Sequence, residues 1–190
     1  VSNGVISLVE DYTLADTDAD GNLDGTFASG SDRVGILLEG GGAFTGNISN
    51  SSTVTIEGNN SAGIRLDGQL IGDLTVDGPV NLTGDNGAGV EINGGVTGDV
   101  SLAGRIAVLG TASAGLLINS GITGALDISS VMSATGFHST TRPATDAGIA
   151  ALDPDDLRVG GSTVDVRYNV GGGITFKGIG VEDDLDDDGD

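Results

Sequence analysis

The sequence predicts an all-β fold, a right-handed parallel β-helix (β-solenoid) with 26-residue coils. One observation is a set of glycines that recur at a constant spacing, and a second is the alternation of aliphatic residues between them, the period of a strand with one buried face. A third is composition, because a chain with 3% aromatic residues and no Cys must build its core from small aliphatic side chains. Three glycine series share the step: Gly46, Gly72, Gly98, Gly124; Gly58, Gly84, Gly110, Gly136; and Gly63, Gly89, Gly115.

Within one unit we expect three short strands, Leu74 to Asp77, Val80 to Thr83 and Val90 to Asn93. Their links are too short for helices, so each strand must pair in parallel with its equivalent one unit away. Glycine suits the corners, where positive φ angles and close backbone approach are needed. The right-handed winding follows the preference of parallel crossovers. The residues expected to point inward are Leu74, Val76, Val80, Leu82, Val90, Ile92 and Val96.

Two insertions interrupt the repeat. Val164 to Ile174 aligns with Ile64 to Leu74, so the step from Gly124 to Gly172 is one 26-residue unit plus a 22-residue insertion, and we place an inserted loop at 137–160. Near the other end, Val5 to Glu10 and Val34 to Leu38 are expected strands around an inserted acidic loop at 11–33. Both loops leave the solenoid at the same corner. Residues 1–182 then form one domain, and 183–190 an acidic tail that begins a possible calcium loop or a linker.

The charge of the chain limits its partners. Seven basic and 28 acidic residues give a formal net charge of −21, and the basic residues form no patch. This charge argues against nucleic acid and anionic membrane surfaces as partners. The absence of Cys leaves the compartment open.

The acidic stretch DTDADGNLDG has the ligand spacing of a calcium loop. Alternate carboxylates of a tight loop can converge on a hard cation, and Gly21 allows the sharp turn. The order is similar to thrombospondin type 3 calcium loops and to the first half of an EF-hand, but Phe27 stands where an EF-hand has its bidentate Glu. The alternative is a solvated acidic loop. The candidate calcium ligands are Asp16, Asp18, Asp20, Asn22 (through its backbone carbonyl) and Asp24, with a weaker second set at Asp184, Asp186, Asp188 and Asp190.

We expect no catalytic residues. His138 is the only histidine and is expected in a surface loop, because a zinc site or a serine triad would have to be built around it alone. The outward acids of the repeats are sparse and lack aromatic platforms for sugars, so a solubilising face is favoured over a glycosidase or lyase site. These acids are Glu57, Asp67, Asp73, Asp77, Glu91 and Asp99.

The units FTGNISNSSTVTIEGNNSAGIRLDG and GLLINSG, with the opening VISLVEDYTLADTDADGNLDG, resemble the passenger region of bacterial autotransporters (type V secretion) of sphingomonad-like Gram-negative bacteria. The resemblance implies a secreted chain exposed at the cell surface or outer membrane, anchored by a C-terminal β-barrel in the parent chain. The start at Val1 without Met fits a processed or excised segment.

Three functions remain open at this stage. The leading one is a noncatalytic cell-surface passenger module, structural or adhesive, with a calcium-stabilised loop and a ligand on a host surface or a neighbouring cell. The second is a surface-layer or filament subunit that self-associates through solenoid ends or edges with calcium in the junction, because unpaired strand edges invite stacking. The third is a carbohydrate-active enzyme with its site on an inserted loop.

Overall fold

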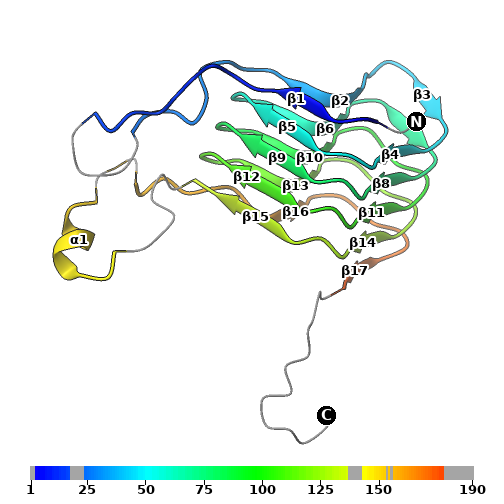
Figure 1. Cartoon of the computed structure of the whole chain (residues 1–190). Coiled ribbons are helices and arrows are strands. Elements are labelled where there is room, and N and C mark those ends of the chain that lie inside the picture. Colours follow the sequence, from blue (N-terminus) through cyan, green and yellow to red (C-terminus); the bar gives the residue numbers. More distant parts are fainter. Residues whose placement is uncertain (1–2, 18–23, 137–142, 153, 155, 178–190) are drawn as a thin grey trace, which may run out of the picture.

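The structure, a computed structural model, describes residues 3–17, 24–136, 143–152, 154 and 156–177 of the chain. Three parallel sheets of five strands each form the sides of a β-solenoid (Figure 1). Sheet 1 contains β1 (Ile6–Leu8), β5 (Val54–Glu57), β9 (Val80–Thr83), β12 (Ile106–Leu109) and β15 (Met132–Thr135). Sheet 2 contains β2 (Val34–Leu38), β6 (Ala62–Leu66), β10 (Ala88–Ile92), β13 (Ala114–Ile118) and β16 (Val164–Val166). Sheet 3 contains β4 (Ile48–Asn50), β8 (Leu74–Val76), β11 (Val100–Leu102), β14 (Leu126–Ile128) and β17 (Ile174–Phe176).

The predicted 26-residue solenoid is confirmed by the strand register. In sheet 1, Val54 pairs with Val80, Val80 with Ile106, and Ile106 with Met132. A fourth, narrower ladder between sheets 2 and 3 begins with β3 (Ala43–Thr45) and β7 (Gln69–Ile71) and continues through single bridges from Leu70 to Val96, Ile122 and Val170. Each coil therefore lies on the next with the same residues in contact.

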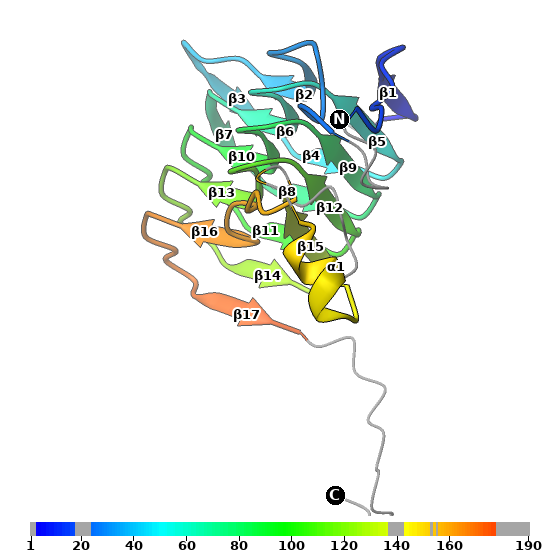
Figure 2. The ribbon, with the colours of Figure 1, turned by 90° about the vertical axis from the view of Figure 1, so that its left-hand side faces the viewer.

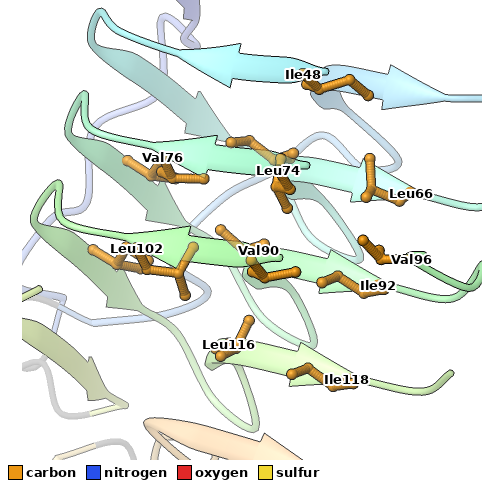
Figure 3. Packing of buried hydrophobic residues seen from close by; sticks show 14 of the residues in the cluster. Ile48, Leu66, Leu74, Val76, Val90, Ile92, Val96, Leu102, Leu116 and Ile118 are labelled. Carbon is orange, nitrogen blue, oxygen red and sulfur yellow. The ribbon is translucent and has the colours of Figure 1, made fainter. Parts of the chain in front are cut away.

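The inward residues expected from the alternation form the core. All seven, from Leu74 to Val96, are at most 1% exposed. They belong to one cluster in which each side chain packs on its counterparts in neighbouring coils, as Leu66, Ile92 and Ile118 do in Figure 3. Because large rings are rare in this chain, Leu, Ile and Val fill the interior.

Strand bounds differ slightly from those expected. β8 ends at Val76, and β10 begins at Ala88, before Val90. The first coil is also longer than the others in one place, since β2 pairs with β6 at a 28-residue step, Val34 opposite Ala62, whereas Ala43 pairs with Gln69 at the usual 26-residue step. Two extra residues therefore lie between Leu38 and Ala43.

Gly63, Gly89 and Gly115 recur because there is no room for a side chain. A Cβ on Gly89 would lie 2.5 Å from Ile106 Cγ2 and 2.7 Å from the carbonyl oxygen of Gly115 in the next coil. The neighbouring corner repeats a different feature, a residue in the left-handed region that Asn and Asp tolerate better than most. Its members are Asp32 (φ 59°), Asn60 (51°), Asn86 (56°) and Ala112 (56°).

Both insertions leave the solenoid between sheet 1 and sheet 2, one between β1 and β2 and the other between β15 and β16, and Figure 1 shows them on the same side of the stack. The second contains α1 (Asp146–Ala150), a short helix that the sequence analysis did not predict, capped by the Thr145 hydroxyl, which accepts from Gly148 N. Figure 2 looks onto this side, with α1 in front of the coils. Among the described residues, no helix is long and apolar enough to span a membrane.

Candidate functional site

The side lobe, as we name the described parts of residues 11–30 and 143–158, is where the chain departs from the repeat. In the first coil the repeat resumes at Ser31, which bridges Asn59. In the last coil it resumes at Val159, whose carbonyl accepts a hydrogen bond from Ala112 N. The two described stretches of the side lobe therefore have no counterpart in the middle coils.

Glu10 fixes the base of the side lobe. Its carboxylate accepts hydrogen bonds from Ser29 N (2.9 Å), Ser29 Oγ (2.8 Å) and Gly30 N (2.8 Å), and it lies 3.0 Å from Arg33 Nη1. Burial of this side chain works to raise its pKa, but the hydrogen bonds from Ser29 and Gly30 and the charge of Arg33 outweigh burial, so the pKa of Glu10 lies below its ordinary value. Glu10 is thus held as an anion that joins the two ends of the first insertion.

The next coil completes this base. Glu10 N donates to Glu57 Oε2 (2.6 Å), and Arg33 Nη1 donates to the carbonyl of Glu57 (2.6 Å). Asn59 Nδ2 donates to the carbonyl of Ala28 (2.8 Å). Phe27 and Ala28 are both buried, although they lie in an insertion, so the returning arm of the loop packs tightly. The position aligned with an EF-hand glutamate is therefore occupied by a buried ring.

Further from the solenoid, the two arms of the first insertion, residues 12–17 and 24–26, are joined by hydrogen bonds in a segment that we call the neck. Tyr12 Oη donates to the carbonyl of Thr26 (3.1 Å), and Ala15 and Asp24 form an antiparallel bridge. Thr17 donates to Asp24 Oδ2 through both its backbone N and its Oγ1, the latter at 2.7 Å. The neck therefore brings the first and last predicted calcium ligands, Asp16 and Asp24, to the two sides of the loop.

The other predicted ligands, Asp18, Asp20 and Asn22, lie outside the described residues, as do His138 and the weaker set Asp184, Asp186, Asp188 and Asp190. Within the part of the chain that the structure describes, no group of three or more His, Cys, Asp or Glu side chains is arranged to hold a metal ion. The donor chemistry of the first loop fits calcium, because Asp16 and Asp24 offer the carboxylate oxygens that a hard cation prefers.

The two insertions contact each other. Arg158 Nη1, from the second insertion, donates to the carbonyl of Gly25 in the first (3.1 Å), across 133 positions of the sequence. Asp156, two residues earlier, is 2% exposed. No repeat predicts this contact, and only the shared corner of the two insertions indicated that they could meet.

The outward acids of the coils do more than keep the surface soluble. Asp73 Oδ1 accepts from Asp99 N (2.9 Å) and Asp99 Oδ1 from Ala125 N (2.8 Å), so each carboxylate binds the backbone of the next coil. Glu91 pairs with Arg65 (2.6 Å), and Asp67 accepts from Asn93 Nδ2 (2.7 Å). The ladder of Asn59, Asp85 and Thr111 follows the same rule. The ladder of Asp67, Asn93, Asn119 and Arg167 links neighbouring coils through side chains alone.

Shallow hollows occur on the outer faces of the described coils. The one on sheet 1 has a volume of about 280 Å³ and is bordered by Thr83, Arg105, Ala107 and Thr135. Neither paired carboxylates nor an aromatic ring borders it, so this hollow lacks the groups with which a glycosidase cleaves and holds a sugar.

A scan of family models found no match to the chain, and searches of curated proteins and of solved structures found none either.

Proposed function

We propose that the chain is a noncatalytic cell-surface module of the autotransporter passenger type, in which the solenoid is a rigid support and the side lobe is the adhesive part. The observation that carries this proposal is the contact between the insertions, Arg158 to Gly25. Two excursions that leave opposite ends of a regular stack and meet beside it form one surface that is free of the repeat. The polar side chains of the coils, in contrast, are largely used in holding coil to coil.

The test is removal of the second insertion without shortening the solenoid. Strands β13 and β16 pair at a 48-residue step, Leu116 opposite Val164, so deletion of residues 137–158 restores the 26-residue step. We expect the shortened chain to keep its far-ultraviolet circular dichroism and to lose binding to cells that the whole chain binds. Unchanged binding would assign adhesion to the solenoid faces. Release of reducing sugar from a panel of glycans by the whole chain would overturn the noncatalytic role.

Calcium belongs to the same proposal. When bound, the ion would supply a positive centre that holds the carboxylates of the loop together, with Asp16 and Asp24 among its ligands. A ligand that binds only the folded chain stabilises it by about 2.7 kcal/mol at a hundredfold excess over Kd, enough to raise Tm by several degrees.

Thermal melts in calcium and in chelator measure this shift. We expect Asp16→Asn to reduce it. Asp77→Asn is the matched control, because Asp77 is an exposed acid on a coil and its substitution changes the net charge equally. Melts of the unmodified chain that coincide in calcium and chelator would refute the calcium site.

A further inference from the structure

The first and last coils are the only places where the described core is incomplete. Nine hydrophobic residues pack against the core while remaining partly exposed, and every one lies in an end coil. In the first coil these are Ile6, Ile36, Leu38 and Phe44, and in the last coil they are Met132, Ala134, Val164, Val166 and Val170. Ile174 and Phe176 of β17 are more exposed still, at 42% and 66%. The interior side chains therefore meet the solvent at the two ends of the stack.

The backbone is open at the same two ends. Within the described residues, β1, β2 and β4 are the outer strands of the three sheets at one end, and β15, β16 and β17 are those at the other. Such edges present unpaired N–H and C=O groups, to which another strand can add. At the first-coil end, Ile36, Leu37, Leu38, Phe44 and Ile48 also line an apolar hollow of about 280 Å³. The described parts of both insertions extend sideways from the stack and do not lie over the end coils (Figure 1).

The two ends match each other in register. Each of the three five-stranded sheets begins in the first coil and ends in the last. The displacement that relates one coil to the next would therefore place the first coil of a second copy on the last coil of this one. If the register of each sheet is continued by one step, the apolar side chains of the last coil lie on those of the first. The resulting pairs are Met132 on Ile6, Val164 on Ile36, Val166 on Leu38, Val170 on Phe44 and Ile174 on Ile48.

Charge is complementary at the same junction. Arg167 ends the outward ladder of Asp67, Asn93 and Asn119, and its Nη1 donates to Asn119 Oδ1 (3.1 Å). Its Nε (3.0 Å) and Nη2 (2.7 Å) donate to Asp165 Oδ2 in its own coil, and the side chain remains 55% exposed, so a further carboxylate can still approach it. Glu39 begins this ladder, because it follows Leu38 as Asp67 follows Leu66, and Leu38 pairs with Leu66. The continued register therefore places Arg167 beside Glu39, a cation on an anion in a strongly acidic protein.

We propose that each end of the solenoid binds a second copy of this chain, head to tail, with β15, β16 and β17 of one copy paired in parallel with β1, β2 and β4 of the next. Such a contact is heterologous and does not close, so it extends into filaments. The proposal names a partner for the structural role above, and either can fail alone, because adhesion by the side lobe does not require assembly.

Charge reversal tests the junction. We expect the unmodified chain to grow in mass with concentration in analytical ultracentrifugation, at an ionic strength of about 0.15 M, where the Debye length of about 8 Å limits repulsion between the acidic bodies. Glu39→Arg and Arg167→Glu should each weaken assembly about tenfold, because each places like charges at the junction. An equimolar mixture of the two variants should assemble again, since every mixed junction pairs Arg with Glu. An unmodified chain that stays monomeric, or a mixture no better than either variant, would overturn the proposal.

Cysteine cross-linking tests the register, because the chain has no Cys of its own. Ser49 and Thr175 lie on the outside of sheet 3 at opposite ends of one ladder, four steps or about 19 Å apart within a copy. At the proposed junction they lie on adjacent strands about 4.8 Å apart, within disulfide range. The double variant Ser49→Cys with Thr175→Cys should give a ladder of oligomers on oxidation. The control, Thr75→Cys with Thr175→Cys, should not, and equal cross-linking by Ser49→Cys alone would show a head-to-head contact instead.

Discussion

In the middle coils Leu66, Leu82 and Ile92 are at most 1% exposed and each packs on the equivalent residue one coil away, whereas the side lobe depends on single contacts between residues far apart in the sequence. Glu10 binds Ser29 and Gly30, and Arg158 reaches Gly25. A substitution in the stack is felt by two neighbouring coils, while one in the side lobe removes a contact that nothing repeats. The two regions should therefore fail in different ways.

The end coils lie between these extremes. They have the side chains of the repeat but a neighbour on one side only, so their residues should contribute less to stability than the same column does in the middle. Leu38, Leu66 and Ile92 occupy one column of sheet 2 and allow this comparison directly.

The largest effect is expected from Leu66→Ala. Leu66 is fully buried, so the lost contacts and the cavity should lower the free energy of unfolding by about 3 kcal/mol. Leu38→Ala, in the same column of the first coil, should cost less than about half as much, because Leu38 is already partly exposed. Urea denaturation of dilute protein measures both. Equal losses would mean that the end coil is as well packed as the middle.

The next largest difference in stability is expected between substitutions at two adjacent glycines, Gly94 and Gly95. A Cβ on Gly94 would run into the carbonyl of Gly68 in the preceding coil, whereas a Cβ on Gly95 would lie 3.7 Å from the nearest atom, the carbonyl oxygen of Gly121. Gly94→Ala should therefore lower stability by about 1–3 kcal/mol through overpacking. Gly95→Ala should be neutral or slightly stabilising, because it restricts the unfolded chain. The same urea titration separates them, and the comparison fails if both variants unfold alike.

Acid should loosen the base of the side lobe. The pKa of Glu10 is lowered in the folded chain, so its contribution is fully present above the ordinary pKa of 4.5 and is lost as the pH falls through the lower folded value. Glu10→Gln should cost about 1 kcal/mol at neutral pH and make limited proteolysis of the side lobe less sensitive to acid. The control is Glu39→Gln, an exposed acid outside the side lobe, which should keep the pH dependence of the unmodified chain. A similar acid response in all three chains would exclude Glu10 as its source.

The smallest effect is a gain. Ala112 holds a left-handed corner that Asn60 and Asn86 hold in the neighbouring coils. Because Asn tolerates this conformation better than Ala, Ala112→Asn should raise stability by about 0.5–1 kcal/mol. Thermal unfolding measures the gain, and a lower Tm would mean that the new amide clashes with the returning chain at Val159.

The repeating part of the fold could be predicted because residues one repeat apart in the sequence contact each other in neighbouring coils. The spacing of Gly63, Gly89 and Gly115 and the alternation from Leu74 to Leu82 specify which residues stack and which face they occupy, before any coordinates. Strand ends were less well predicted, as at β10, because Gly89 was expected to mark a corner, yet Ala88 before it still pairs with Ala62 and Ala114.

The side lobe could be placed at its corner but not assembled. Nothing in the sequence joins Arg158 to Gly25, because a single hydrogen bond between two insertions leaves no periodic trace. The hydrogen bonds and ion pair of Glu10 could not be predicted either, because the sequence shows only a single acid after the first strand. Glu57 was expected only to solubilise, yet it accepts a hydrogen bond from Glu10 N, since the next coil happens to supply the missing acceptor.

The contact between Arg158 and Gly25 also restricts the number of coils that the solenoid can have. A solenoid can gain or lose one whole coil by duplication or deletion of a 26-residue unit, and every remaining ladder would be preserved. An added coil, however, would move the origins of the two insertions apart by about 4.8 Å, more than a hydrogen bond can bridge. The side lobe thus ties this chain to one length of stack, and a lengthened descendant would have to lengthen an insertion as well.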